Sequence, residues 1–525
     1  MTADMDSSSA RTIADLPERF NAACDLLDHN VAERADKVAV IDRDGRTTYG
    51  DLADRVAAMA AVFGALGVRR EQRILLCLLD TVDFPTVFLG AIRAGIVAIP
   101  LNTLLVADDY RWILQNSEAT AVFVSEELAQ QWSGFAGEFP DVRFVSCGGG
   151  PWPKLGEMLG RAREAERLPP ADTHRDDVAF WLYTSGSTGR PKGAMHSHAS
   201  MRLTANLFGI GVVGYREDDV ILSVAKQFFA YGLGNALSFP YAAGATVILY
   251  DGRATPSAIG RLIVEHQVTI LNGVPTFFAA FFASGDAPTK KEAPRLRIAT
   301  SAGECLPAHL GEQFLERYGA DVIDGLGSTE MLHVYLAQSP GRVRYGCTGR
   351  AVPGYEIRLI DDDGREAGPN QLGELQVRGP TAAIGYWRNR PKSLATFQGE
   401  WTRTGDKYSC DEEGWYTYGG RSDDMLKVGG NYVSPIEVEE ALVGHASVLE
   451  VAVIGAADAD GLIKPRAYVV LSPGEQPSDA LEAALKAHVK KLLAPYKYPR
   501  WIVFADDLPK TATGKIQRFR LRENA

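Results

Sequence analysis

The sequence predicts an α/β protein, with a large N-terminal domain of layered, parallel-rich sheets and helices and a small α+β domain after it. Three observations support this prediction. Short apolar strands alternate with amphipathic helices through the first half of the chain. After about Tyr335 the segments become short and strand-like between turn residues, and beyond Gly419-Gly420 helices return and the chain ends in a basic segment. Alternating strands and helices are typical of parallel sheets with helices packed on their faces.

The first half supplies this alternation in order. Residues 51–66 place Leu52, Val56 and Met59 on one helical face, and residues 84–94 form another helix with an apolar face. Buried strands are expected at residues 73–79, 96–101, 121–124, 220–224 and 246–250. No repeat of 20 to 50 residues is visible, which argues against a solenoid.

The second half predicts two smaller bodies. Strand-like segments at residues 355–361, 373–378 and 415–418 flank turns such as Asp363-Gly364 and indicate a small, mostly β subdomain. Beyond it we expect helices at residues 435–442 and 479–493 and strands at residues 448–455 and 466–471. The predicted domains are residues 1–422, with the β-rich subdomain at about 336–422, and residues 423–525.

Composition excludes several classes of protein. An apolar fraction of 46% and a charged fraction of 23% are those of a globular protein, and the net charge of −11 argues against nucleic-acid binding. The six cysteines are too widely spaced for a disulfide framework or a zinc knuckle. The N-terminus lacks an apolar signal region, and the most apolar stretch is too short to cross a bilayer. We therefore expect a cytoplasmic protein without a membrane or nucleic-acid partner.

The positive charge is concentrated at the C-terminus. Residues 481–525 contain ten Lys or Arg residues against four Asp or Glu residues, a net charge of +6. This fits a site for a small polyanion, and it equally fits a solvated basic face.

A loop rich in glycine and hydroxyl groups directly follows the apolar strand at residues 179–182. It reads Tyr183-Thr-Ser-Gly-Ser-Thr-Gly-Arg-Pro-Lys-Gly193. Glycines allow close backbone approach, hydroxyl and N–H groups suit phosphate oxygens, and Lys192 adds a mobile positive charge. The loop differs from the G-x-x-x-x-G-K-[ST] phosphate loop. A flexible surface linker is the alternative, but linkers rarely follow a buried strand directly.

This loop resembles the signature of the adenylate-forming superfamily, which comprises acyl-CoA ligases, peptide-synthetase adenylation domains and firefly-type luciferases. The resemblance implies ATP as co-substrate and assigns catalytic roles to Thr188 and Lys192. It assigns nucleotide contacts to Thr184, Ser185, Gly186, Ser187, Thr188 and Gly189.

Further segments match the family in its order and spacing. Asp324-Gly-Leu-Gly-Ser-Thr-Glu330 resembles the segment for nucleotide and metal, in which Glu330 offers a hard oxygen ligand to Mg²⁺. Asp406 and Arg421 resemble the two ribose contacts, and a carboxylate can accept two hydrogen bonds from a diol. Nucleotide contacts are thereby implied for Asp324, Gly325, Leu326, Gly327, Ser328 and Thr329, and, from the adenine-packing segment, for Ser301, Ala302, Gly303 and Glu304.

The resemblance spans about residues 20–523 and so includes the C-terminal domain. Lys515, within Pro509-Lys-Thr-Ala-Thr-Gly-Lys-Ile-Gln-Arg518, matches the adenylation lysine, which also contacts nucleotide, and Asp423 falls at the family's hinge. Lys427 matches a catalytic position beside the thiol. Contacts with coenzyme A are expected at Gly429, Gly430, Lys464 and Arg466. The resemblance implies a mobile domain that first brings in Lys515 and then rotates at Asp423 to present the Lys427 loop.

The family chemistry explains these residue types. The carboxylate of an acid attacks the α-phosphorus of ATP, and negative charge builds on phosphate oxygens and on the departing pyrophosphate. Mg²⁺, Thr188, Lys192 and Lys515 would offset that charge.

The segment from Gln227 to Asn235 aligns with the acyl pocket, where members that activate amino acids place an aspartate. Here the segment is aromatic and uncharged, which suits a flat ring with one carboxylate. The expected pocket residues are Phe228, Phe229, Ala230, Tyr231, Gly232, Ala302, Gly327, His333 and Val334. Core packing is an alternative role for Phe228 and Phe229. His333 could bond a ring hydroxyl or amine of the substrate, or it could pack in the core and bond the backbone.

The finer resemblance is to benzoate–CoA ligases, in residues 225–237, 327–333, 423–428 and 494–500. We therefore expect an aryl-CoA ligase of aromatic compound degradation that uses ATP, Mg²⁺ and coenzyme A as a monomer or a homodimer. Benzoate, 4-hydroxybenzoate and aminobenzoates stay open, because an apolar pocket rejects an added hydroxyl poorly. The alternatives are an aryl adenylation domain that loads a carrier protein and a non-catalytic nucleotide sensor. Lys515, Glu330 and the loop hydroxyls count against the sensor.

Overall fold

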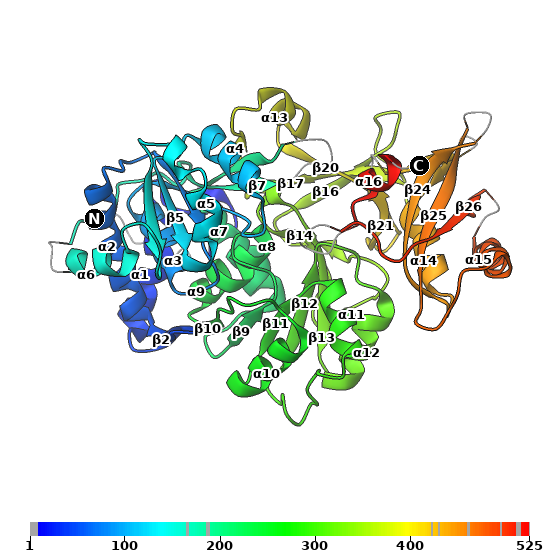
Figure 1. The fold of residues 1–525 in the computed structure, drawn as a ribbon, viewed down its shortest axis with the longest axis horizontal. Helices are drawn as coiled ribbons and strands as arrows, with labels where there is room; N and C mark the ends of the chain where they lie inside the picture. Colours follow the sequence, from blue (N-terminus) through cyan, green and yellow to red (C-terminus); the bar gives the residue numbers. More distant parts are fainter. Residues whose placement is uncertain are drawn as a thin grey trace. The chain divides into compact units, whose positions relative to one another are not determined.

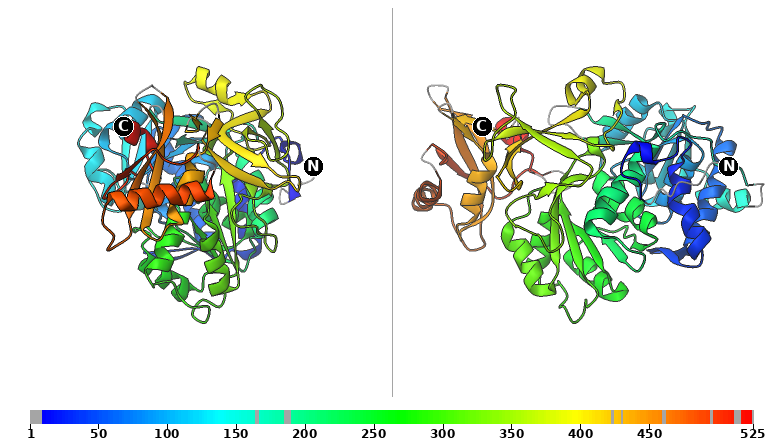
Figure 2. Two further views of the ribbon diagram at one scale, coloured as in Figure 1. Left: turned by 90° about the vertical axis from the view of Figure 1, so that its right-hand side faces the viewer. Right: turned by 180° about the vertical axis from the view of Figure 1, so that it is seen from behind.

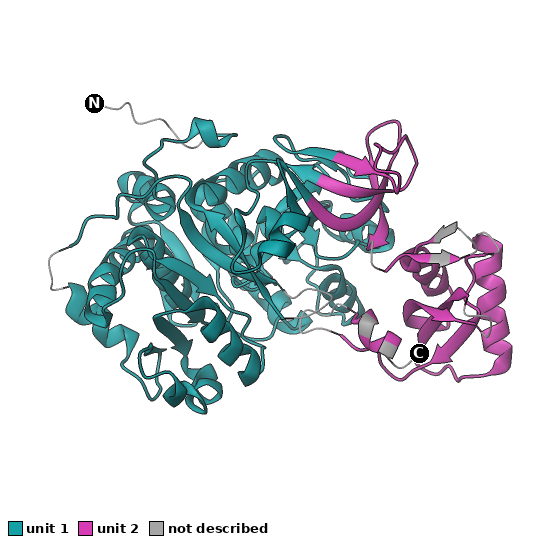
Figure 3. Ribbon diagram, turned by 90° about the horizontal axis from the view of Figure 1, so that it is seen from above, with its two compact units in different colours: residues 1–357, 377–402 teal, residues 358–376, 403–525 magenta. Residues whose placement is uncertain are grey.

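The computed structural model describes residues 9–163, 167–184, 190–421, 424–428, 431–458, 462–493, 496–510 and 516–523. The chain divides into two units, one of residues 1–357 and 377–402 and one of residues 358–376 and 403–525 (Figure 3). Residues 422 and 423 lie outside the described residues, so the predicted domain boundary between them stays a prediction.

The first unit contains a sheet in the order β18-β8-β7-β4-β3-β5-β6 (Figure 1). Its five strands from β7 to β6 run parallel, and β8 and β18 extend one edge in antiparallel fashion. The strands are β3 (Arg73–Cys77), β4 (Val97–Pro100), β5 (Ala121–Ser125), β6 (Arg143–Cys147), β7 (Val178–Thr184), β8 (Lys192–Ser197) and β18 (Gly385–Tyr386). All described residues of β4 and β5 are buried, as parallel strands covered on both faces require.

A second sheet of the same unit has the order β15-β14-β13-β12-β11-β9-β10-β1-β2. Its six central strands, β13, β12, β11, β9, β10 and β1, run parallel. The antiparallel strands β2, β14 and β15 form its edges. The strands are β1 (Val38–Asp42), β2 (Gly45–Thr48), β9 (Val220–Ser223), β10 (Thr246–Ile248), β11 (Ile270–Gly273), β12 (Ile298–Ala302), β13 (Asp321–Gly327), β14 (Val334–Ala337) and β15 (Arg350–Ala351). Two parallel-rich sheets with helices confirm the predicted α/β class.

Helices cover both sheets, and one core cluster contains side chains from each sheet, among them Val40 and Val247 from one and Ile74 and Phe180 from the other. The main helices of the unit are α1 (Ala22–Arg34), α2 (Tyr49–Leu66), α3 (Asp83–Arg93), α4 (Ala107–Ser117), α5 (Ala129–Ser133), α6 (Leu155–Arg163), α7 (His198–Thr204), α8 (Ala230–Leu233), α9 (Phe239–Ala243), α10 (Pro256–His266), α11 (Pro275–Ala283), α12 (Ala308–Tyr318) and α13 (Arg390–Thr396). No helix among the described residues is long and apolar enough to cross a bilayer.

Two π-helical segments follow α7 and α8 directly: η5 (Ala205–Val213) and η6 (Gly234–Ser238). The sequence pattern predicted no helix or strand for either segment. π-helical turns are rare and are frequent at functional sites.

The remaining sheets and helices belong wholly or in part to the second unit. One sheet has the order β16-β17-β20-β19, with β21 paired to β20, and its strands are β16 (Glu356–Ile360), β17 (Gly373–Arg378), β19 (Phe397–Gln398), β20 (Trp401–Cys410) and β21 (Tyr416–Arg421). The later elements are β22 (Leu426–Val428), β23 (Asn431–Val433), α14 (Pro435–Val443), β24 (Val448–Ala457), β25 (Ile463–Leu471), α15 (Asp479–Leu492), β26 (Trp501–Phe504) and α16 (Arg518–Glu523). Helix α15 lies along one face of the β24-β25-β26 sheet, where Leu485 and Val489 join its core (Figure 2).

A buried histidine links the first helix to α7. His198 begins α7, and its Nδ1 accepts a hydrogen bond from the Ala22 N–H at 3.2 Å. Burial lowers the pKa of His198 to about 4, so the ring stays neutral in the folded protein. The unfolded chain takes up a proton below pH 6.5 that the folded ring does not take up until about pH 4. Stability is therefore lost as the pH falls through this window.

We expect His198→Asn to reduce this acid sensitivity. Asparagine can offer an acceptor near the position of Nδ1 but binds no proton, which removes about 1.4 kcal/mol of pH dependence per pH unit within the window. The drop in Tm between pH 7 and pH 5 should be smaller than in the unchanged protein. The exposed His309, changed to Asn, serves as the control. An equal drop in both variants would contradict the assignment.

Candidate active site

The predicted nucleotide segments meet at the carboxyl ends of β11, β12 and β13. In the parallel register Ser301 pairs with Gly273 and with Asp324, and Ala302 pairs with Gly325. Ligands of open α/β sheets bind outside the carboxyl ends of the strands. The structure thus brings together the two segments, residues 301–304 and 324–329, that nineteen residues separate in the sequence.

Glycine is required on β13 because the neighbouring strand approaches its backbone closely. A Cβ atom on Gly327 would lie 2.7 Å from the His333 carbonyl oxygen, and one on Gly325 would lie 2.7 Å from Cγ1 of Val334. Gly327 pairs directly with Val334 across the β13–β14 ladder. Nucleotide-segment and pocket residues are therefore in contact through the backbone itself.

Asp324 is a buried carboxylic acid at this edge. Burial is the main influence on this carboxyl group and raises its pKa to about 7. Its Oδ1 atom has no hydrogen-bond partner among the described residues. A carboxyl group close to half protonated at neutral pH can either donate or accept a hydrogen bond.

Tyr386 connects Glu330 to β8, the strand that follows the glycine- and hydroxyl-rich loop of residues 183–193. Its hydroxyl donates to Oε1 of Glu330 at 2.6 Å, and Nζ of Lys192 lies 5.3 Å from its ring centroid. Tyr386 pairs with Ala194 on β8, so the register of β8 and β18 sets this arrangement. Sequence reasoning missed Tyr386, because no spacing rule relates a Gly-Tyr-Trp run at residues 385–387 to Glu330.

A buried histidine contacts the backbone of the same segment at Thr329. The Thr329 carbonyl accepts a hydrogen bond from Nε2 of His196 at 2.8 Å. Burial lowers the pKa of His196 to about 4, so this ring is neutral. Among the described residues no three His, Cys, Asp or Glu side chains gather as a metal site. Glu330 as a single carboxylate fits Mg²⁺, which proteins commonly hold through one or two carboxylates together with substrate phosphates.

The two ends of the loop that is predicted to bind phosphate are paired across β7 and β8. Thr184, the last residue of β7, lies opposite Lys192, the first residue of β8. The loop residues predicted to contact phosphate, Ser185, Gly186, Ser187, Thr188 and Gly189, lie outside the described residues. The structure thus fixes where the loop leaves and re-enters the sheet.

His333 lies buried in an aromatic surround, 2% exposed. Its ring centroid is 4.5 Å from that of Phe239, 5.3 Å from that of Phe208 on η5 and 5.4 Å from that of Tyr231. A Cβ atom on Gly234 of η6 would lie 2.3 Å from its Cδ2 atom. The two π-helical segments therefore supply part of the packing around this residue.

Hydrogen bonding defines the state of His333. Burial lowers its pKa to about 3, so the ring is neutral, and Nε2 donates to the Tyr231 carbonyl at 3.2 Å. Nδ1 is then an acceptor, and it has no hydrogen-bond partner among the described residues. His333 thus combines two of the predicted roles, core packing and a backbone hydrogen bond, and keeps one unused acceptor.

A chain of buried hydroxyl and amide groups holds Tyr231. The Thr300 hydroxyl donates to Oδ1 of Asn272 at 2.7 Å. The Thr300 hydroxyl oxygen then accepts from the Tyr231 hydroxyl at 2.5 Å. The Tyr215 hydroxyl also donates to Oδ1 of Asn272, at 3.1 Å. None of these supporting residues could be identified from the sequence, because they lie on strands and segments far from the acyl motif.

Part of the rest of the acyl segment packs in the hydrophobic core. Phe228 is buried in the large core cluster, where its ring centroid lies 4.4 Å from that of Phe229, which is only partly buried. Ala230 begins α8, and a Cβ atom on Gly232 would lie 2.0 Å from the Lys226 carbonyl oxygen. No charged group belongs to residues 227–235.

The second unit brings together the two predicted ribose contacts. Asp406 and Arg421 are register partners on β20 and β21, and Nη1 of Arg421 donates to Oδ1 of Asp406 at 3.0 Å. Gly405 has a φ of 74°, and a Cβ atom there would lie 2.9 Å from Arg421 Nη2. Two positions 15 residues apart thus form one polar pair.

The predicted contacts with coenzyme A are described only in part. Lys464 and Arg466 lie two residues apart on β25 and so face the same side of that strand. Lys464 lies 4.0 Å from Asp458, and the Arg466 guanidinium stacks 5.0 Å from the Trp501 ring centroid. Lys427 lies on β22, but its side chain, together with Asp423, Gly429, Gly430 and Lys515, lies outside the described residues.

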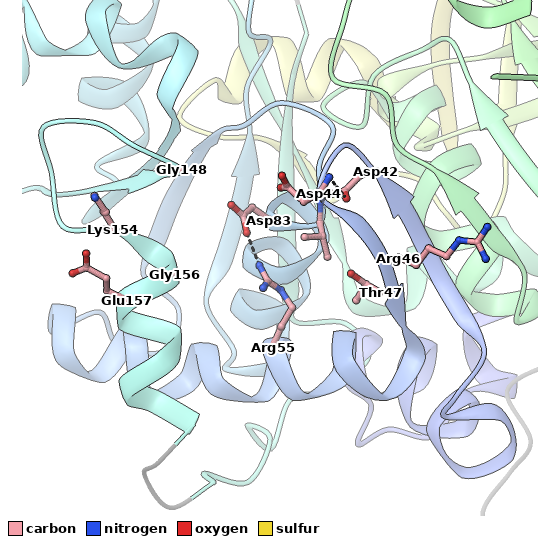
Figure 4. Close-up of a pocket in the computed structure, with 11 residues that line it drawn as sticks. Asp42, Asp44, Arg46, Thr47, Arg55, Asp83, Gly148, Lys154, Gly156 and Glu157 are labelled. Carbon is pink, nitrogen blue, oxygen red and sulfur yellow. Dashed lines mark hydrogen bonds and ion pairs between the residues drawn. The ribbon is translucent and has the colours of Figure 1, made fainter. Parts of the chain in front are cut away.

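A cavity of about 560 Å³ lies elsewhere in the first unit and is lined by none of the predicted site residues (Figure 4). Acidic and basic side chains surround it, including Asp42, Arg46 and Lys154. Arg55 points toward Asp83 inside it, with 2.5 Å between Nη2 and Oδ1. This charged lining does not suit an apolar ring.

Comparison with known proteins gives the same family as the motifs. The family model for AMP-binding enzymes matches residues 27–387, and that for their C-terminal domain matches residues 437–515. A benzoate–CoA ligase of Thauera aromatica is 51% identical over 521 residues, which cover 98% of each chain. The chain is thus similar along almost its whole length to an enzyme named for this reaction.

Solved structures agree with this result. A benzoate CoA ligase from Burkholderia xenovorans LB400 is 49% identical, with a TM-score of 0.89 over 96% of this chain and 100% of that chain. An anthranilate CoA ligase in complex with anthranoyl-AMP is 40% identical, with a TM-score of 0.92 over 98% of both chains. These matches confirm the resemblance drawn from the motifs, and the chain belongs to the family of AMP-binding enzymes.

Proposed function

We propose that this protein is an ATP-dependent aryl-CoA ligase that converts benzoate, or a close ring-substituted analogue, into its coenzyme A thioester. One observation carries the proposal: the near full-length similarity, at 51% identity, to the benzoate–CoA ligase of Thauera aromatica. The uncharged, partly aromatic segment beside the carboxyl ends of β12 and β13 supports an aromatic acid rather than an amino acid. Its use of ATP and coenzyme A fits a cytoplasmic enzyme, as a monomer or a homodimer.

The first half-reaction forms the acyl-adenylate. A carboxylate oxygen of the acid attacks the α-phosphorus of ATP, a P–O bond forms, and the bond to pyrophosphate breaks. Thr188 and Lys192 bind the phosphate oxygens, while Lys515 orients the attacking carboxylate and offsets the developing charge. Mg²⁺ held by Glu330 and the phosphates would supply further positive charge.

The second half-reaction forms the thioester. The sulfur of coenzyme A attacks the acyl carbonyl carbon, the bond to AMP breaks, and the thiol proton is released. Residues 427–430 line the approach of the thiol, and the Asp406–Arg421 pair holds the ribose. Because Lys515 and Lys427 both belong to the domain that follows the hinge at Asp423, rotation of this one small domain can present each of them to the site in turn.

The overall reaction is tested by measuring AMP release with different acids, with and without coenzyme A. We expect release with benzoate, 4-hydroxybenzoate and 2-aminobenzoate, weak release with cyclohexanecarboxylate and none with acetate, each dependent on coenzyme A. Turnover with an aryl acid that consumes no coenzyme A would contradict the proposal and favour a carrier-loading enzyme. ATP binding without pyrophosphate release would indicate a sensor.

We expect Lys515→Ala to abolish most of the first half-reaction and to spare the second. Loss of one charge-stabilising group commonly costs about 10²–10³ in rate. Pyrophosphate release with benzoate should fall by that factor, while thioester formation from supplied benzoyl-AMP stays within about threefold. The control is Lys486→Ala, which removes a lysine paired with Glu482 on α15. Equal loss of both half-reactions would refute the assignment.

Lys427→Ala should give the opposite pattern. Because residues 427–430 are assigned to the thiol approach, thioester formation from benzoyl-AMP should slow by at least about tenfold while pyrophosphate release is little changed. Normal thioester formation would exclude this role for Lys427.

A further inference from the structure

The last helix of the chain is anchored by a partly buried ion pair. Arg518 begins α16, directly after residues 516 and 517, and its Nη2 donates to both carboxylate oxygens of Glu439 at 2.9 and 2.7 Å. Its Nε donates to Oε1 of the same residue at 3.2 Å. Glu439 lies on α14, so this pair joins two helices 79 residues apart in sequence.

Glu439 is itself fixed to the sheet. Its Oε1 accepts the backbone N–H of Val453 on β24 at 2.7 Å. The side chains of Arg518 and Glu439 are only 17% and 12% exposed. Burial alone would lower the pKa of Arg518, but the carboxylates of Glu439 and Asp424 raise it above its ordinary value. Such a pair is well shielded from solvent, and removing one partner leaves an uncompensated charge.

The chain just before residues 511–515 is also held to β24. Nζ of Lys510 donates to both carboxylate oxygens of Glu450 at 2.9 and 2.7 Å. The Gln517 N–H donates to the Pro509 carbonyl at 2.7 Å, and Lys510 and Ile516 form an isolated β-bridge. The two ends of the segment that contains Lys515 therefore lie side by side, each anchored by an ion pair.

Asp424 extends this arrangement toward the predicted hinge. One of its oxygens lies 3.8 Å from Nη1 of Arg518, and it also accepts a hydrogen bond from Arg522. Asp424 directly follows Asp423, the predicted hinge residue. Arg518 thus faces acidic groups from two places, α14 and the start of the segment after the hinge.

We propose that Glu439 and Arg518 are positioning residues for the first half-reaction: they hold the chain after residues 511–515, as the Lys510–Glu450 pair holds the chain before them, so that Lys515 enters the site in one orientation. This inference rests on the role of Lys515 in the proposed function. Membership of the family of AMP-binding enzymes does not by itself imply this role of the ion pair in adenylate formation.

A group that orients a nucleophile must be placed accurately, and an error of 1 Å can cost about 10² in rate. The thioester step uses residues 427–430 on the β22–β23 hairpin, which Arg518 does not contact through any hydrogen bond or ion pair between described residues. Loosening the pair should therefore slow one half-reaction selectively.

The test is Glu439→Gln, measured in both half-reactions with the full-length protein. Glutamine keeps the shape and an acceptor for the Val453 N–H but removes the charge facing Arg518. We expect pyrophosphate release with benzoate and ATP to fall at least about tenfold in kcat with little change in the KM for ATP. Thioester formation from supplied benzoyl-AMP and coenzyme A should stay within about threefold.

The matched control is Glu437→Gln on the same helix. Its carboxylate accepts from Nζ of Lys497 at 2.5 and 2.7 Å, an ion pair of similar geometry that does not involve the chain around residues 511–515. Pyrophosphate release should be unchanged in this variant. Arg518→Lys, which keeps the charge but loses the forked contact, should fall between the unchanged protein and Glu439→Gln, and it replaces Glu439→Gln if that variant does not fold.

Two outcomes overturn the inference: unchanged pyrophosphate release in both variants, or an equal loss of both half-reactions, which indicates a structural role only. Lys515→Ala in the same assays separates this failure from that of the proposed function. If Lys515→Ala loses pyrophosphate release and Glu439→Gln does not, only the positioning role is wrong. If Lys515→Ala keeps it, the assigned role of Lys515 is wrong and the positioning role falls with it.

Discussion

The parallel register of β11, β12 and β13 determines where every other part of the proposed site can lie. Because Ser301 pairs with Asp324, the two segments that resemble nucleotide contacts end at the same edge of the sheet. The antiparallel strand β14 then passes so close to β13 that only glycine fits at Gly325 and Gly327. This close approach places His333 and Val334 beside the nucleotide segment, so the predicted pocket and the predicted nucleotide site share one wall.

Two buried histidines in this part of the first unit are neutral at physiological pH. Burial keeps His196 and His333 uncharged and brings the pKa of Asp324 to about 7. A neutral, water-poor surround strengthens the interaction of any cation that enters it with a reacting carboxylate and phosphate. The proposed reaction accordingly uses Lys192 and Lys515, from segments that flank the site, rather than a buried charge inside the pocket.

Much of the fold was predictable, because parallel strands are nearly continuous apolar runs: residues 73–79 and 121–124 correspond to β3 and β5 within two residues. The segments assigned to the nucleotide could be located because their glycines and hydroxyls are contiguous in sequence, and their role stays a prediction. Tyr386, Thr300 and Asn272 were not, since each acts on a site residue through tertiary contact from a distant element. The π-helical segments η5 and η6 also carry no distinct pattern, because their apolar residues are equally compatible with an α-helix or a buried strand.

The central claim is that adenylate and aromatic ring bind together at the carboxyl edge of β12 and β13. A crystal structure with a non-hydrolysable benzoyl-AMP analogue tests it most directly. The account predicts adenine density against Ser301–Gly303 and the benzoyl ring beside Tyr231 and His333. Density for the analogue in the charged cavity around Arg55 and Asp83, or anywhere away from that edge, would contradict it.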